Sequence, residues 1–224
     1  MNRQFNNTSA DNDDDDARAT IIIDKAPIVI SSFAEAKQSG LISDVLFKVI
    51  SREGKSKNYT DVIPLDGGTV GIAHFAVGGL SDLYDEMDTD KYFGKTKKEM
   101  KDNFSSQCRP AGKKGNDTGW GCYSKQWWKD GMVKFGNSEE SKQVQDTAWS
   151  NKMEPVITQA IGHGWKSRRE IAIALGIANS VGAGGFAELA KKNDWDAEAT
   201  LSGYVGNNDH RKRRAAAINN HFAK

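Results

Sequence analysis

The feature that most constrains this chain is one long apolar segment, "SRREIAIALGIANSVG", at residues 167–182. Apolar side chains cover most faces of a helix with this sequence, which is typical of a helix buried on all sides. Asn179, Ser180 and several glycines interrupt the apolar run, so it falls short of the roughly 20 residues that cross a bilayer. We therefore predict a central core helix and no membrane insertion.

Other segments have the periodicity of amphipathic helices that could pack around this core. They are residues 31–40, residues 41–54, a helix capped by Ser81, a helix that begins at Ser138 and is broken at Pro155, and residues 186–193 and 210–222. Residues 100–137 are rich in loop-forming residues. Strand character is confined to residues 57–78, where two short runs flank a Pro-Leu-Asp-Gly-Gly turn. The expected class is α+β, a helical body with one hairpin.

The 224 residues divide unequally. Residues 1–18 are polar and acidic and are predicted to form a disordered linker, whereas residues 19–224 form one domain. The start of the chain has no apolar signal-peptide region, which favours a fragment of a larger protein that is exported by another route. Cys108 and Cys122 flank a glycine-rich loop. The sequence allows either a disulfide between them or two free thiols. We predict no metal and no cofactor, because no cluster has the spacing of metal ligands.

Global charge identifies no partner, since 31 basic residues face 30 acidic ones. The basic run "HRKRR" at residues 210–214 has no interleaved aromatic residues. We interpret it as a solvated helix face and predict no nucleic-acid partner.

Residues 53–75, "EGKSKNYTDVIPLDGGTVGIAHF", carry the candidate catalytic groups. Glycoside hydrolysis needs one acid to protonate the leaving oxygen and a second group to act as nucleophile or base. Partial burial at a helix end would raise the pKa of Glu53 and keep it protonated, whereas Asp61 and Asp66 lie on the more exposed hairpin. Thr69 could hold the attacking water.

The order of these residues resembles phage-type lysozymes. Glu53-Gly54, Tyr59-x-Asp61 and Thr69-x-Gly71-x-x-His74 follow one another as in that family, with two extra residues between the aspartate and the threonine. This resemblance implies Glu53 as the general acid, Asp61 as the second carboxylate and Thr69 as the residue that positions water.

A second resemblance, to the family 46 chitosanases, reaches further along the chain. The segment "DGGTVGIAHFAVGGLSDLYDEM" is similar to that family's Asp-Gly-x-Gly-x-Thr-x-Gly motif, with two residues missing between Gly67 and Thr69, and residues 141–165 resemble its central region. This resemblance implies Asp66 as the second carboxylate. We favour Asp66 over Asp61 because the similarity continues after Thr69. An inverting mechanism then predicts carboxyl groups about 6.5–9.5 Å apart.

Together the resemblances cover roughly residues 40–215 and imply a lysozyme-like fold of two lobes, with the hairpin at a substrate cleft. Tyr59, His74, Trp120 and Trp127 are the candidate substrate-binding residues. His74 could orient the hairpin through a hydrogen bond to a carboxylate. The structural alternatives are a histidine whose hydrogen bonds serve only the fold, which we favour, and tryptophans that fix the loop to the body.

We expect a muramidase that cleaves the β-1,4 bonds of peptidoglycan glycan strands. The alternatives are a chitosanase and a non-catalytic wall-binding module. The resemblance also implies delivery to the bacterial periplasm as part of a secretion-system effector or spike. An immunity protein is an allowed partner, and we expect a monomer.

Overall fold

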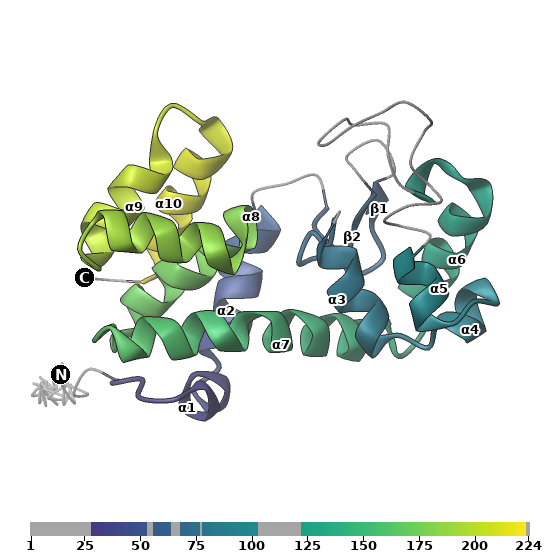
Figure 1. Ribbon diagram of the computed structural model, residues 1–224, viewed down its shortest axis with the longest axis horizontal. Coiled ribbons are helices and arrows are strands. Elements are labelled where there is room, and N and C mark those ends of the chain that lie inside the picture. Colours follow the sequence, from purple (N-terminus) through teal and green to yellow (C-terminus); the bar gives the residue numbers. More distant parts are fainter. Residues whose placement is uncertain (1–27, 53–55, 64–67, 77, 103–121, 223–224) are drawn as a thin grey trace, which may run out of the picture.

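The computed structural model describes residues 28–52, 56–63, 68–76, 78–102 and 122–222. These residues are mostly helical and contain one small antiparallel sheet, which confirms the α+β class at this coarse level (Figure 1). The acidic residues 1–18 lie outside the described ranges.

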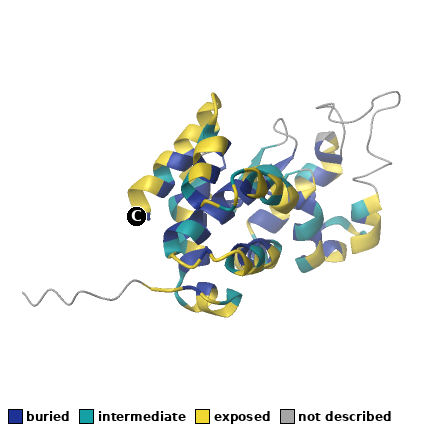
Figure 2. Ribbon diagram, turned by 60° about the vertical axis from the view of Figure 1, so that its left-hand side comes forward, coloured by how far each residue is buried: buried dark blue, intermediate teal, exposed yellow. Residues whose placement is uncertain are grey.

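Figure 1 shows two groups of elements arranged along one long helix, α7 (Ser141–Gly162). The first group consists of α1 (Phe33–Gln38), α2 (Leu41–Lys48), η1 (Ile50–Arg52), α8 (Arg168–Lys192), α9 (Ala197–Val205) and α10 (Asp209–His221). The second group consists of β1 (Val62–Ile63), β2 (Thr69–Val70), α3 (Gly79–Glu86), α4 (Thr89–Phe93), α5 (Lys97–Asp102), η3 (Cys122–Ser124) and α6 (Gln126–Gly136). Residues coloured as buried lie mainly where these helices face one another (Figure 2).

Helix α8 is the core helix that the sequence predicts. Residues 171–178 are all buried, and a capping box between Ser167 and Glu170 begins the helix. By length and composition alone α8 could cross a membrane, but half of its apolar window is packed inside the protein. The helix changes direction at Gly182, which has a φ of 78°. Just before this kink, Asn179 accepts a hydrogen bond of 3.1 Å from the Trp149 indole of α7.

Helix α7 corrects the prediction that Pro155 breaks the chain's helical path, because the helix continues through this proline to Gly162. Pro155 lies on the exposed side, so the carbonyl that loses its intrahelical hydrogen bond can be solvated. Met153, Val156 and Ile157 are buried around it and hold the helix in place. Packing therefore outweighs the local preference.

Three further predictions at helix boundaries are wrong. Ser138 does not cap α7; its hydroxyl donates to the Phe135 carbonyl at the end of the preceding helix. Ser81 lies inside α3, which begins at Gly79. Within the segment predicted to be loop, α6 forms 11 helical residues.

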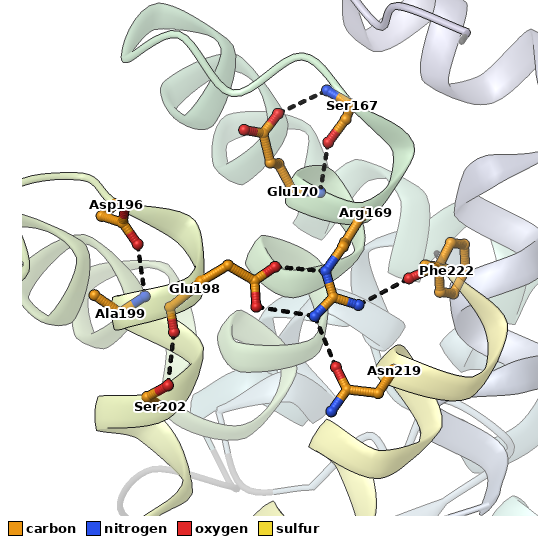
Figure 3. A network of polar contacts seen from close by, with 9 residues as sticks. All are labelled: Ser167, Arg169, Glu170, Asp196, Glu198, Ala199, Ser202, Asn219 and Phe222. Atoms are coloured by element: carbon orange, nitrogen blue, oxygen red, sulfur yellow. Dashed lines mark hydrogen bonds and ion pairs between the residues drawn. The ribbon is translucent and has the colours of Figure 1, made fainter. Parts of the chain in front are cut away.

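Arg169 joins the three helices of the C-terminal part, as Figure 3 shows. Its guanidinium is buried and makes two contacts of 2.5 and 3.0 Å with the Glu198 carboxylate of α9. It also donates to the Asn219 side chain of α10 at 2.7 Å and to the Phe222 carbonyl at 2.8 Å. One side chain from the first turn of α8 therefore connects α9 with both the body and the end of α10.

Candidate active site

The two strands of the hairpin pair in a short antiparallel register. Val62 lies opposite Val70, and Ile63 lies opposite Thr69. Thr69 is buried, with 7% of its surface exposed. The strands thus frame residues 64–67, which contain Asp66 and lie outside the described ranges, as Glu53 does. In the sequence, Thr69 directly follows Gly67 and Gly68.

A tight turn follows β2 and depends on Gly71. The backbone groups of Val70 and Phe75 exchange hydrogen bonds of 2.8 and 3.0 Å, and the chain reverses between them. Gly71 has a φ of 65°, in the left-handed region that favours glycine. A β-carbon at this position would lie 1.6 Å from the Gln145 side-chain oxygen of α7. The glycine is therefore needed for its backbone conformation and for the space beside α7.

Ser56 ties the segment after Glu53 to this turn. Its hydroxyl is buried and donates to the Gly71 carbonyl at 2.7 Å. The His74 Nε2 lies 2.7 Å from the Ser56 carbonyl oxygen, and a carbonyl oxygen only accepts, so Nε2 carries the proton in this contact. These contacts hold the chain three residues after Glu53 against the hairpin. The His74 contact is to a backbone carbonyl and fits the structural histidine that the sequence allowed.

Asp61 stabilises the loop that leads into β1. Its Oδ2 accepts backbone hydrogen bonds from Lys57 at 2.6 Å and from Asn58 at 2.9 Å. Its own carbonyl accepts from the Gly71 amide at 2.8 Å. One oxygen of the carboxylate is thus occupied by the turn that it closes.

Tyr59 anchors the same loop to α7. Its hydroxyl donates to Asp146 at 2.6 Å, and its carbonyl accepts from the Gln145 amide at 2.8 Å. Burial, followed by the nearby Asp146 carboxylate, raises the pKa of the Tyr59 hydroxyl well above its ordinary value, so the hydroxyl stays protonated and keeps donating. The hydroxyl predicted to bind substrate is therefore engaged within the protein.

The tryptophans take different positions. Trp128 is fully buried and donates to the Tyr84 hydroxyl at 2.8 Å, so it belongs to the core. Trp127 is 36% exposed on α6, packs edge-on against Phe93, and has the Lys95 ammonium 5.3 Å from its ring centre. Trp120 lies outside the described residues. Trp127 thus offers a surface ring that could stack on a sugar.

Tyr59, Asp61, Thr69 and His74 therefore come together around one hairpin, whereas Trp127 lies on α6. Sequence reasoning missed Gln145, which is fully buried and holds the Tyr59 carbonyl from α7. The available signal was a glutamine on the apolar face of a helix, three residues before Ala148.

The cysteine question is settled for one residue. Cys122 is disulfide-bonded, and the only other cysteine in the sequence, Cys108, lies outside the described residues. Within the described residues, no group of three or more His, Cys, Asp or Glu side chains could hold a metal ion.

Comparison with models of protein families, with curated proteins and with solved structures found no match.

Replacing Gly71 with alanine is expected to destabilise the protein by about 2 kcal/mol or more, because the left-handed backbone and the Gln145 contact both oppose a β-carbon. Gly40→Ala is the matched control, since Gly40 has a φ of 70° with nothing within 4 Å of an added β-carbon. Thermal unfolding of the two variants isolates the effect of Gln145. Equal losses of stability would show that Gln145 does not restrict this turn.

Proposed function

We propose that this chain is a glycoside hydrolase of lysozyme-like architecture that cleaves the glycan strands of peptidoglycan. Glu53 is the proposed general acid, an aspartate at the hairpin is the base, and Thr69 positions the attacking water. The proposed site of action is the bacterial cell wall, reached by delivery from a larger effector or spike.

The observation that carries this proposal is the hydrogen bond from Ser56 to Gly71. It attaches the segment just after Glu53 to the hairpin that bears Thr69 and frames Asp66. The short helix η1 ends at Arg52, directly before Glu53, which is consistent with an acid at the end of a helical segment. An acid and a base on two segments held together in this way are what hydrolysis with a positioned water requires.

The contacts of Asp61 favour Asp66 as the base. Asp61 uses one carboxylate oxygen to close a turn, so that oxygen is already engaged by two backbone amides. Asp66 lies in the glycine turn between the two strands in the sequence. We therefore assign the base role to Asp66 and a loop-stabilising role to Asp61.

Incubation with purified peptidoglycan, and separately with chitosan, tests the proposed substrate. The proposal predicts new reducing ends from peptidoglycan and few from chitosan. Release from chitosan alone would favour the chitosanase alternative. Sedimentation with peptidoglycan and no release of reducing ends would favour a wall-binding module.

A further inference from the structure

A second polar feature lies between α1, α2 and α7. An open groove of about 390 Å³ is bounded by Lys37 of α1, the first turn of α2 and one face of α7. Its lining along α7 runs from Lys142 to Ser150, which spans about 12 Å at 1.5 Å per residue, and Glu139 contributes from the turn before this helix. Of the lining residues, Asp146 alone also contacts the candidate active site, through the Tyr59 hydroxyl.

The groove carries charges of both signs. Lys37 and Lys142 contribute ammonium groups, and Glu139 and Asp146 contribute carboxylates. Among the residues that the structure describes, neither lysine forms an ion pair, and Glu139 forms none either. These three charges are therefore available to a ligand, whereas Asp146 already holds the Tyr59 hydroxyl.

One buried hydroxyl in the groove wall is without a partner. Ser150 is 7% exposed, and its Oγ has no hydrogen bond within the described part of the chain. A buried hydroxyl that makes no hydrogen bond costs free energy, and a ligand in the groove could recover it. Ser43, Gln143 and Thr147 add further hydrogen-bonding groups nearby.

The lining discriminates between ligand classes. A simple anion would be repelled by Glu139 and Asp146, and a simple cation by the two lysines. No lining residue is aromatic, so a sugar ring would find no stacking partner. A short peptide with free carboxylate and ammonium groups matches the charges of both signs and the amide and hydroxyl groups, and the volume is sufficient for a few residues.

We propose that this groove binds a short zwitterionic peptide, of the kind that peptidoglycan carries on its glycan strands. The assignment of the peptide to peptidoglycan rests on the proposed function. Asp146 links the two places, because it lines the groove and holds Tyr59, whose loop follows Glu53. Phe47, four residues after Ser43 on α2, is 43% exposed and packs edge-on against Tyr59, which extends the surface toward that loop.

Calorimetric titration with the tetrapeptide L-alanyl-γ-D-glutamyl-meso-diaminopimelyl-D-alanine tests this proposal. The double variant Lys37→Gln/Lys142→Gln should weaken binding about tenfold, and Ser150→Ala about threefold, because they remove charged and neutral hydrogen bonds respectively. Lys192→Gln, an exposed lysine on α8, is the control and should bind as the wild type does. Ser150→Ala should keep the melting temperature of the wild type or raise it, since it removes an unpaired polar group.

Failure of the wild type to bind the tetrapeptide overturns the proposal, as does equal binding by the groove variants and the control. Binding of chitotetraose that the same groove variants weaken would also overturn it. Hydrolysis of peptide-free glycan strands is measured in parallel. If no glycan is hydrolysed while the tetrapeptide still binds through Lys37, Lys142 and Ser150, the proposed function fails and the groove assignment stands.

Discussion

Replacing Glu53 with glutamine is expected to lower the rate of peptidoglycan hydrolysis about 1,000-fold. Glutamine keeps the size and polarity of the side chain but has no proton to give to the leaving oxygen, and general acid catalysis is worth roughly 10²–10⁴ in rate. Release of reducing ends from purified peptidoglycan measures the effect. The melting temperature should not change by more than a degree or two.

The two aspartates provide matched comparisons for this experiment. Asp66→Asn should reduce turnover about as strongly as Glu53→Gln and leave the melting temperature unchanged. Asp61→Asn should instead lower the melting temperature, because its Oδ2 accepts the Lys57 and Asn58 amides. Wild-type turnover by Glu53→Gln would remove Glu53 from the mechanism. A large loss of turnover only in Asp61→Asn, with unchanged stability, would move the base role to Asp61.

Arg169→Met is expected to cause the largest loss of stability, about 2–4 kcal/mol, because four hydrogen bonds of a buried guanidinium are lost. This corresponds to roughly 10 °C in melting temperature for a chain of this size. Methionine keeps the length of the side chain and removes all its donors. The Asn219 and Phe222 oxygens and the Glu198 carboxylate then lose their contacts with the guanidinium, and α9 and α10 lose a shared contact with α8. Thermal and denaturant unfolding measure the change.

Arg168→Met is the control for this variant, because the two arginines are neighbours in the same turn. Arg168 forms one ion pair of 2.7 Å with Asp44 and has a side chain that is 25% exposed, against 6% for Arg169. A partly exposed pair contributes at most about 1 kcal/mol. Similar losses in the two variants would contradict the view that the buried network holds the C-terminal helices together.

The sequence predicted the core helix well, because apolar residues on every face leave few alternatives to burial. It also predicted the hairpin, since a Pro-Leu-Asp-Gly-Gly segment between apolar runs favours a reversal of the chain. The strands proved shorter than expected, with two residues each, because Gly71 turns the chain again soon after Thr69.

Helix α6 was missed for a physical reason. Its glycines suggested a loop, yet a β-carbon at Gly131 would lie 2.2 Å from the Phe93 ring. The glycine allows α6 to approach α4 closely and does not mark a turn. A close approach between two helices depends on tertiary packing, which a local pattern does not reveal.

The anchoring of the candidate site was also beyond the sequence. Gln145 and Asp146 hold Tyr59 from α7, across 86 and 87 positions of the chain. Nothing in the local sequence of α7 indicates which loop these side chains meet. The residue types and their order around Glu53 indicated acid–base hydrolysis. Only the contacts in the folded structure distinguish residues that position the hairpin from residues that are candidates for the reaction.

The central claim is that an acid, a base and a held water hydrolyse β-1,4 bonds of peptidoglycan at this hairpin. The most direct measurement is a time course of proton NMR spectra recorded while the protein acts on soluble glycan strands. We predict that the α-anomer of the new reducing end forms first and that Glu53→Gln forms none, as inversion with Glu53 as the acid requires. Absence of any reducing end, or first formation of the β-anomer, would contradict the account.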